Sequence, residues 1–166
     1  MAGYGRDWPD PKWPGGARVA LQFVINFEEG GENVILHGDA ASEAFLSDIV
    51  NAVPLLGVRH INMESHYEYG SRVGWWRLRR MFAERNLPVT VFAVGMALGR
   101  VPEIAASMVE ADFEIASHGW RWIDYQYIDP ETERAHIKLA VDAIERATGG
   151  KPLGWYTGRM GPKTRR

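Results

Sequence analysis

Short apolar, β-rich segments alternate with segments of helical periodicity along this chain, and this alternation constrains the fold more than any other feature. Four segments are predicted as strands: 18–27, 88–94, 112–117 and 153–156. Four others are predicted as helices: 39–52, 72–85, 102–110 and 130–148. Such alternation indicates β-α-β units around a parallel sheet, which is an α/β fold.

The first predicted strand carries large side chains on both of its faces. With a period of two residues, one face holds Leu21, Phe23, Ile25 and Phe27. The opposite face holds Gln22, Val24, Asn26 and Glu28. Large residues on both faces predict a strand that is buried on two sides.

The first 16 residues differ from the rest of the chain because they are rich in proline and glycine and have no periodic pattern. We interpret residues 1–16 as an extended arm, part of which packs onto the body through Trp8 and Trp13. Residues 17–166 form the second unit. A chain of 166 residues is long enough for one domain with its own core.

The charge pattern argues against a protein that binds nucleic acid. The net charge is -2, without the basic excess of a nucleic-acid-binding surface. Positive charge gathers near the end of the sequence, at Lys151, Arg159, Lys163, Arg165 and Arg166. Two interpretations stay open: a tail that binds an anionic partner, or a loop that packs against the acidic body.

Composition also limits where the protein works. The chain contains no cysteine, which excludes disulfides and thiolate metal sites. It starts with no apolar leader, and it has no apolar run of about 18 residues, the length that crosses a membrane. We therefore expect a cytoplasmic protein that does not contact a membrane.

Candidate site residues stand where the predicted strands end. Glu28 and Glu29 end the first strand, His118 follows the third, and Arg159 follows the fourth. Right-handed crossovers place these ends on one rim, where α/β proteins build their sites. The Glu28–Glu29 pair alone favours a solvated strand end without a function, but His118 in the segment SHGWRW shifts the interpretation to an acid–base group. Structural roles are expected for His37, His60, His66 and His136.

Five segments, in order, resemble the polysaccharide deacetylase (NodB-homology) family: NFEEGGEN, HGDAASEAF, MESHYEYGSRVG, IASHGWRWIDY and LGWYTGRMGPKTRR. Within the family, they resemble most the branch of cofactor-independent allantoinases. The resemblance implies that residues 17–166 form the N-terminal portion of a distorted (β/α) barrel, similar to a TIM barrel, with the site at its carboxyl rim. The family's later motifs, which include a histidine that acts as general acid, have no counterpart in the sequence.

The resemblance also implies roles for individual residues. In metal-dependent members, the first motif has two aspartates, a base and a metal ligand, and Glu28 and Glu29 occupy those positions. The second motif has two metal-binding histidines, which match His118 and Trp122. The third motif has an arginine that positions the catalytic carboxylate, and it matches Arg159.

Because indole cannot coordinate a metal, and a catalytic zinc needs three protein ligands, we predict no metal and no cofactor. The predicted catalytic residues are Glu28, His118 and Arg159. The predicted substrate-binding residues are Asn26, Glu29, Trp122 and Trp155.

The function that the resemblance implies is hydrolysis of a carbon–nitrogen bond, in which allantoin, a ureide of purine degradation, becomes allantoate. Two alternatives stay open: a metal-dependent polysaccharide N-deacetylase of carbohydrate metabolism, and a non-catalytic assembly module. A partial barrel leaves an apolar sheet edge and face open. We therefore expect the chain to form a homo-oligomer. The other expected partner is a small-molecule ureide substrate.

Overall fold

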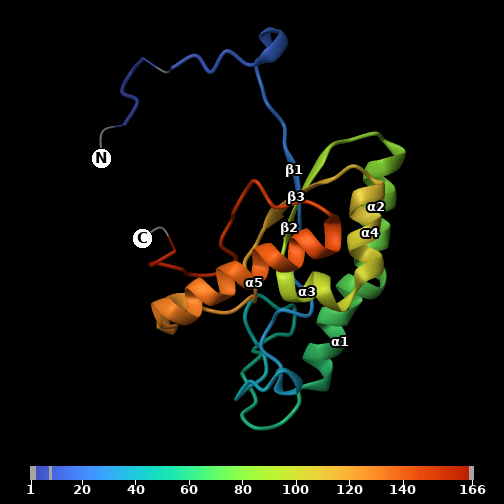
Figure 1. Ribbon diagram of the computed structural model, residues 1–166, viewed down its shortest axis with the longest axis vertical. Coiled ribbons are helices and arrows are strands. Elements are labelled where there is room, and N and C mark those ends of the chain that lie inside the picture. Colours follow the sequence, from blue (N-terminus) through green and yellow to red (C-terminus); the bar gives the residue numbers. More distant parts are fainter. Residues whose placement is uncertain (1–2, 8, 165–166) are drawn as a thin grey trace.

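The computed structural model describes residues 3–7 and 9–164, which build a three-stranded parallel sheet with helices packed on one side (Figure 1). The strands are β1 (Phe23–Phe27), β2 (Val89–Ala93) and β3 (Glu114–Ser117), in the order β1-β2-β3. Each strand pairs with its sequence neighbour, as in a barrel wall. The α/β prediction is confirmed.

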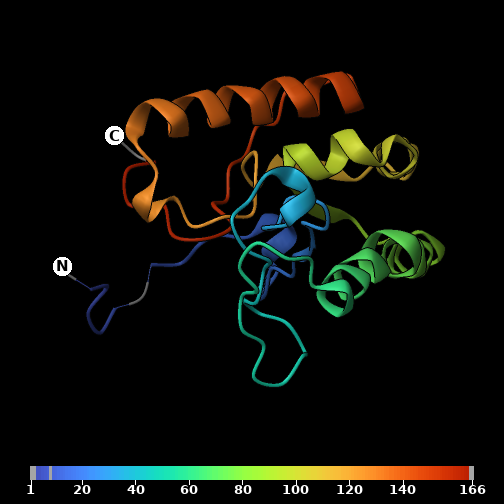
Figure 2. The same ribbon diagram turned by 90° about the horizontal axis from the view of Figure 1, so that it is seen from below.

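The helices are α1 (Ile61–Tyr69), α2 (Trp75–Glu84), α3 (Gly95–Arg100), α4 (Pro102–Glu110) and α5 (Pro130–Thr148). Seen from below, they form an arc from α5 through α3 and α4 to α1 and α2 (Figure 2). Successive right-handed crossovers between neighbouring parallel strands place every helix on the same side of the sheet. The arrangement is therefore an open segment of a barrel.

The two faces of the sheet differ in burial. Toward the helices, Ile25 pairs with Val91, and Phe27 pairs with Ala93, and all four are buried. On the opposite face, the Val24 side chain is 39% exposed. The prediction that the first strand is buried on two sides is therefore wrong for the described chain, because the helices cover only one face.

The core lies between this covered face and the helices. Its fully buried residues include Val91, Leu98, Ile104, Met108 and Ile144, each at 0% exposure. Trp75 joins α2 to this core by an edge-on contact with Phe27, and its indole N–H donates to the Ser107 hydroxyl at 2.8 Å. The buried layer fixes the strands against α2, α4 and α5, and so it fixes the rim where they end.

Predicted helices with strong start and stop signals are found at the predicted residues. The helices over 102–110 and 130–148 coincide with α4 and α5. At the start of α5, the Asp129 carboxylate accepts hydrogen bonds from the backbone N–H groups of Glu131 and Thr132. At its end, Gly149 adopts a left-handed conformation with φ 81°, which closes the helix.

The predicted helix over 39–52 does not form. The Glu43 carboxylate accepts hydrogen bonds from the backbone N–H groups of Ala44 and Phe45, both at 2.9 Å. Such local side-chain bonds compete with the bonds of a helix. Leu46 and Asn51 also have positive φ angles of 51° and 56°. The segment is a loop that lies over the carboxyl rim.

The helix predicted over 72–85 is the second part of a longer helical run, because α1 precedes it and a π-helical turn, Gly70–Gly74, joins α1 to α2. A side chain at Gly70 would meet the Glu29 carboxylate, so glycine there leaves room for the Glu29 side chain. Helix α3 was not predicted. The predicted strand 153–156 is reduced to one parallel bridge, between Ser117 and Trp155.

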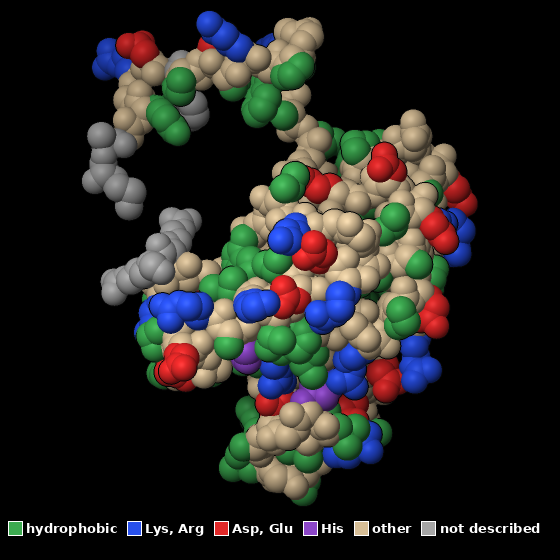
Figure 3. Space-filling view, viewed as in Figure 1, with side chains coloured by type: hydrophobic (Ala, Val, Ile, Leu, Met, Phe, Trp, Pro, Cys, Tyr) green, Lys and Arg blue, Asp and Glu red, His purple; other side chains and the backbone are tan. Residues whose placement is uncertain are grey.

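The N-terminal arm extends away from the body (Figure 3). Residues 3–7 and 9–20 are exposed, and Trp13 is 41% exposed. The expected packing of Trp13 is therefore not found, and Trp8 lies outside the described residues. Among the described helices, none is long and apolar enough to cross a membrane.

The basic residues near the end of the sequence contact the body. The Arg159 guanidinium donates to Glu43, and the Lys163 ammonium donates to the Ile128 carbonyl at 3.0 Å. Lys151 lies 4.0 Å from Glu145. These contacts favour the packed loop over the free tail. Arg165 and Arg166 lie outside the described residues.

Candidate active site

The candidate site lies at the carboxyl rim of the sheet, where backbone hydrogen bonds continue past the strand ends. The backbone N–H of Val94 donates to the Phe27 carbonyl, and that of His118 donates to the Ala93 carbonyl, both at 2.9 Å. The backbone N–H of Tyr156 donates to the Ser117 carbonyl, also at 2.9 Å. These bonds hold Glu28, His118 and the segment 156–159 side by side.

Glu28 and His118 form the centre of the site. His118 Nε2 lies 2.9 Å from Glu28 Oε1, and the Asn26 amide donates to the same oxygen at 3.2 Å. The His118 residue is only 2% exposed, whereas the Glu28 side chain is 20% exposed. The prediction that residues at the strand ends lie together on one rim is therefore confirmed for Glu28 and His118, which are 90 positions apart in the sequence.

The contacts of His118 fix the number of protons in the pair. His118 Nδ1 lies 2.6 Å from the Tyr156 carbonyl oxygen, which can only accept, so Nδ1 carries a hydrogen. One further proton is then needed between His118 Nε2 and Glu28 Oε1, as imidazolium and carboxylate or as imidazole and carboxylic acid. The His118 imidazole thus holds one oxygen of Glu28 in place at the floor of the site.

Aromatic rings fix the plane of the His118 imidazole. Phe92 and Tyr156 stack at 4.8 Å with an interplanar angle of 6°. The imidazole lies nearly parallel to both rings, at 5.7 Å from Phe92 and 5.8 Å from Tyr156. Because the ring cannot turn freely, Nε2 remains directed at Glu28.

Glu29 turns away from Glu28. Its carboxylate accepts the backbone N–H of Glu28 at 3.2 Å and lies against Gly70 of the π-helical turn. Burial raises the pKa of the Glu29 carboxyl, and the nearby Glu28 and Glu32 carboxylates raise it further, while backbone hydrogen bonds lower it. Glu29 lines two neighbouring pockets and separates them.

The resemblance implies that Arg159 positions the catalytic carboxylate, but among the described residues the hydrogen bond of Arg159 goes to Glu43 and not to Glu28. Its guanidinium donates to Glu43 at 3.2 Å and lies over the rings of Phe45 and Trp122, at 4.5 and 5.2 Å from their centres. Both partners of the Arg159–Glu43 pair are shielded from water, with side chains 17% and 5% exposed. Arg159 thus ties the loop over 39–58 to the rim.

Trp122 forms a buried wall next to this pair. The residue is 3% exposed, and its indole N–H has no hydrogen-bond partner within residues 3–7 and 9–164. A Cβ atom at Gly158 would lie 2.9 Å from Trp122 Cδ1 and 3.1 Å from His118 Nε2. Glycine at this position lets the chain pass directly over both rings.

A pocket of about 440 Å³ opens in front of Glu28. Its described walls include three predicted site residues besides Glu28, namely Asn26, Glu29 and Trp122. It is also lined by Asp48, His66 and Tyr67, which were not predicted as site residues. Trp155 does not line it, because its N–H bonds within its own loop to Thr157 at 3.1 Å. The segment MESHYEYG was the signal for His66 and Tyr67, but its helix was not predicted.

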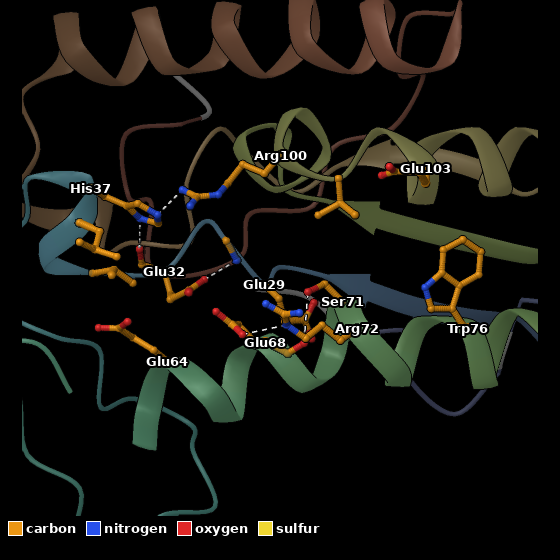
Figure 4. Close-up of a pocket in the computed structure, with 14 residues that line it drawn as sticks. Glu29, Glu32, His37, Glu64, Glu68, Ser71, Arg72, Trp76, Arg100 and Glu103 are labelled. Atoms are coloured by element: carbon orange, nitrogen blue, oxygen red, sulfur yellow. Dashed lines mark hydrogen bonds and ion pairs between the residues drawn. The ribbon is translucent and has the colours of Figure 1, made fainter. Parts of the chain in front are cut away.

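A second pocket of about 490 Å³ lies on the far side of Glu29 (Figure 4). Its walls carry five glutamates and two arginines, and some of these side chains are bonded within the protein. Glu68 pairs with Arg72 at 2.8 Å, and Glu32 accepts the backbone N–H of Gly30 at 2.5 Å. The Arg100 guanidinium contacts the His37 ring. Burial raises the pKa of Glu32, although backbone hydrogen bonds oppose this effect.

The fold is a segment of a (β/α) barrel, and the candidate site is a carboxylate–imidazole pair at its carboxyl rim. These two features together indicate a class of hydrolases built on this barrel. The family model described as polysaccharide deacetylase matches residues 63–165. The chain therefore belongs to the polysaccharide deacetylase family, a family of hydrolases.

Individual relatives refine this assignment. A crystal structure of a probable polysaccharide deacetylase from Pseudomonas aeruginosa PAO1 is 60% identical and covers 99% of this chain and 55% of that chain, with a TM-score of 0.95. The crystal structure of Puue Allantoinase is 57% identical and covers 99% of this chain and 54% of that chain, also with a TM-score of 0.95.

A protein of Schizosaccharomyces pombe named "Putative polysaccharide deacetylase" is 41% identical over 157 residues, which are 93% of this chain and 49% of that protein. The chain thus spans about half the length of the relatives that it matches.

The donor set at the rim does not fit the metal site of the metal-dependent deacetylases. Indole takes the place of the second histidine, and the Trp122 nitrogen carries its hydrogen and has no lone pair to donate. Glu29 turns toward Gly70, and His118 uses both ring nitrogens in hydrogen bonds. Within the described residues, no group of three or more potential ligands lies close enough to hold a metal.

Proposed function

We propose that the protein hydrolyses the ring amide of allantoin to give allantoate, a step of purine degradation in the cytoplasm. The observation that carries this proposal is the Glu28–His118 pair, whose Glu28 lines a pocket of about 440 Å³ with Trp122 where a metal ligand would be needed. The allantoinase relative, 57% identical over nearly the whole chain, supports the choice of substrate.

In the proposed reaction, the free oxygen of Glu28 takes a proton from a water molecule as the water attacks the ring carbonyl carbon. Asn26 and His118 hold the other oxygen of Glu28, so the base points into the pocket. The carbonyl π electrons move to oxygen as the new C–O bond forms. The intermediate then collapses, the ring C–N bond breaks, and the leaving nitrogen takes up a proton.

Arg159 supports this reaction from behind the pocket wall. Its guanidinium lies over Trp122 and packs this indole into the pocket wall. Its bond to Glu43 keeps the guanidinium in place.

The test is an assay of the purified chain with allantoin, with allantoate measured as the product. We expect turnover that persists after chelator treatment and that falls in Glu28→Gln. The competing function is N-deacetylation of a polysaccharide, which the names of two relatives favour. Release of acetate from an N-acetylated glycan that needs an added divalent metal, without allantoin turnover, would replace our proposal.

A further inference from the structure

We propose that Asn26 determines the substrate specificity of the site. Its amide oxygen accepts a hydrogen bond from the ring N–H next to the attacked carbonyl, so the site selects cyclic ureides whose ring nitrogen there carries a hydrogen. The inference rests on the proposed function, because it names the substrate class of the same pocket. The sequence predicts that Asn26 contacts the substrate, and the structure indicates which of its atoms does so.

A chain of hydrogen bonds with fixed directions determines how the Asn26 amide is turned. It starts at the Tyr156 carbonyl, which can only accept, so His118 Nδ1 carries a hydrogen. The proton between His118 Nε2 and Glu28 Oε1 lies between these two atoms, whichever of them holds it. Glu28 Oε1 therefore has no hydrogen for Asn26 and accepts one from it, at 3.2 Å. The amide nitrogen faces Glu28, and the amide oxygen lies on the other side of the group.

The amide oxygen of Asn26 is free to accept from a ligand. Asn26 is exposed and lines the pocket of about 440 Å³, so a bound molecule can reach it. In the part of the chain that the structure describes, no group donates to this oxygen. Its backbone is held in the sheet, because Asn26 lies in β1 and pairs with Phe92 of β2. A strand thus keeps this acceptor at a fixed position beside the base.

Neighbouring polar side chains of the pocket are bonded within the protein. The Tyr67 hydroxyl donates to a backbone carbonyl, and the Tyr69 hydroxyl accepts from an arginine of α2. The Glu29 carboxylate accepts the backbone N–H of the preceding residue. Trp122 offers only an N–H, which is a donor. The Asn26 oxygen is therefore the uncharged acceptor that a substrate N–H meets next to the base.

The charges of the pocket suit a neutral ligand that donates N–H groups. Its described walls include the carboxyls of Glu28, Glu29 and Asp48, with neither lysine nor arginine, which disfavours an anion. In a ring ureide, the N–H next to the attacked carbonyl lies between two carbonyl groups, which makes it a better donor than an ordinary amide N–H. With the attacked carbon above the free oxygen of Glu28, this nitrogen is within reach of Asn26, because the two side chains are in direct contact.

The experiment measures kcat/KM for allantoin and for allantoin methylated at the ring nitrogen next to the attacked carbonyl. The methyl group replaces the hydrogen that Asn26 would accept. In the wild-type chain, we expect methylation to lower kcat/KM by about 100-fold or more, because the site loses the N–H that it is built to bind. In Asn26→Ala, which has no acceptor at this position, the two substrates should differ by less than about fivefold.

The ratio of the two substrates separates substrate binding from support of the base. Asn26 also holds Glu28, but loss of that contact lowers turnover of both substrates by the same factor and leaves their ratio unchanged. Asn26→Leu keeps the side-chain volume without the acceptor, so its kcat/KM for allantoin should lie within about threefold of that of Asn26→Ala. Gln22→Ala is the matched control, because Gln22 lies on the same side of the chain, bonds to Thr90 and does not line the pocket. We expect it to match the wild type with both substrates.

The outcomes separate the two proposals. A wild-type chain that does not hydrolyse allantoin contradicts the proposed function, and the role of Asn26 falls with it. A wild-type chain that hydrolyses allantoin, with the same ratio between the two substrates as Asn26→Ala, leaves the proposed function intact and overturns the role of Asn26. Wild-type turnover of allantoin by Asn26→Leu would also overturn it, because the site would then select substrates by size alone.

Discussion

At the scale of single residues, the Glu28–His118 contact could be predicted because the topology determines it. Glu28 follows β1 and His118 follows β3, so the parallel order of the strands places both on one rim, and their side chains meet across the end of the intervening strand β2. Arg159 shows the opposite case. Its partner Glu43 lies in a loop whose path depends on local hydrogen bonds, and nothing in the spacing of residues 43 and 159 indicates their contact.

Glu28→Gln tests the proposed base directly. Glutamine keeps an oxygen that accepts from Asn26, so the fold should be retained, but its amide cannot take a proton from water. We expect kcat for allantoin to fall by about 100-fold to 10,000-fold, with little change in melting temperature. Activity near that of the wild type would remove Glu28 from the mechanism.

Glu29→Gln should change how stability depends on pH. Because the pKa of Glu29 is raised in the folded protein, its contribution is fully present below the unfolded pKa of about 4.3 and is lost as pH rises through the folded pKa. Glutamine has no such loss. Urea unfolding at pH 4 and pH 7 should therefore show a larger benefit of Glu29→Gln at pH 7. An equal difference at both pH values would contradict the buried position of this carboxyl.

Gly158→Ala should disturb the floor of the site. The new methyl group would meet Trp122 Cδ1 at 2.9 Å and His118 Nε2 at 3.1 Å, so the rings or the backbone must move. We expect a loss of about 1–3 kcal/mol in unfolding free energy, together with lower turnover. Gly99→Ala is the control, since nothing lies within 4 Å of its Cβ position in α3, and it should not destabilise the protein.

At the scale of elements, the sequence predicts well where local signals and tertiary packing agree. Helix α5 has a capping Asp129, a proline in its first turn and a closing Gly149, and it was predicted to the residue. A helix was also predicted over 39–52, but there the Glu43 carboxylate bonds to the adjacent backbone and to Asn33 at 2.7 Å. Those hydrogen bonds outweigh the helix propensity of the segment. A prediction from the sequence pattern alone does not take them into account.

Glu43→Ala should destabilise the loop over the rim. The change removes the acceptor of Arg159 and leaves that guanidinium shielded from water without its partner. We expect a loss of about 3 kcal/mol in unfolding free energy, measured by urea denaturation. Asp142→Asn, which removes the partner of Lys138 on the surface of α5, should change stability little. Equal effects of the two variants would show that the rim pair is not shielded in solution.

At the scale of the whole molecule, the sequence pattern of the first strand did not predict that one face of the sheet is uncovered. Its apolar residues satisfy the pattern of a strand buried on two sides, but this chain supplies helices for one face only. The chain also spans about half the length of its relatives. The pattern of one strand reports which faces can be buried, and it does not report what covers them.

We expect this open face to bring two copies of the chain together, because Val24 is 39% exposed there and exposed apolar side chains favour association. Sedimentation velocity should show a species heavier than the 18.7 kDa chain. Val24→Lys, on the open face, should shift the population toward the monomer. Val50→Lys, at a loop position that is 85% exposed, should not. A compact monomer for all three proteins would contradict the expected association.

The position of Glu29 has a consequence for the two cavities on either side of it. Its side chain lines both pockets, and its carboxylate lies against the backbone of Gly70. The same carboxylate accepts the backbone N–H of the proposed base, Glu28. We therefore expect a ligand that displaces Glu29 from the side of the charged pocket to alter the position of Glu28.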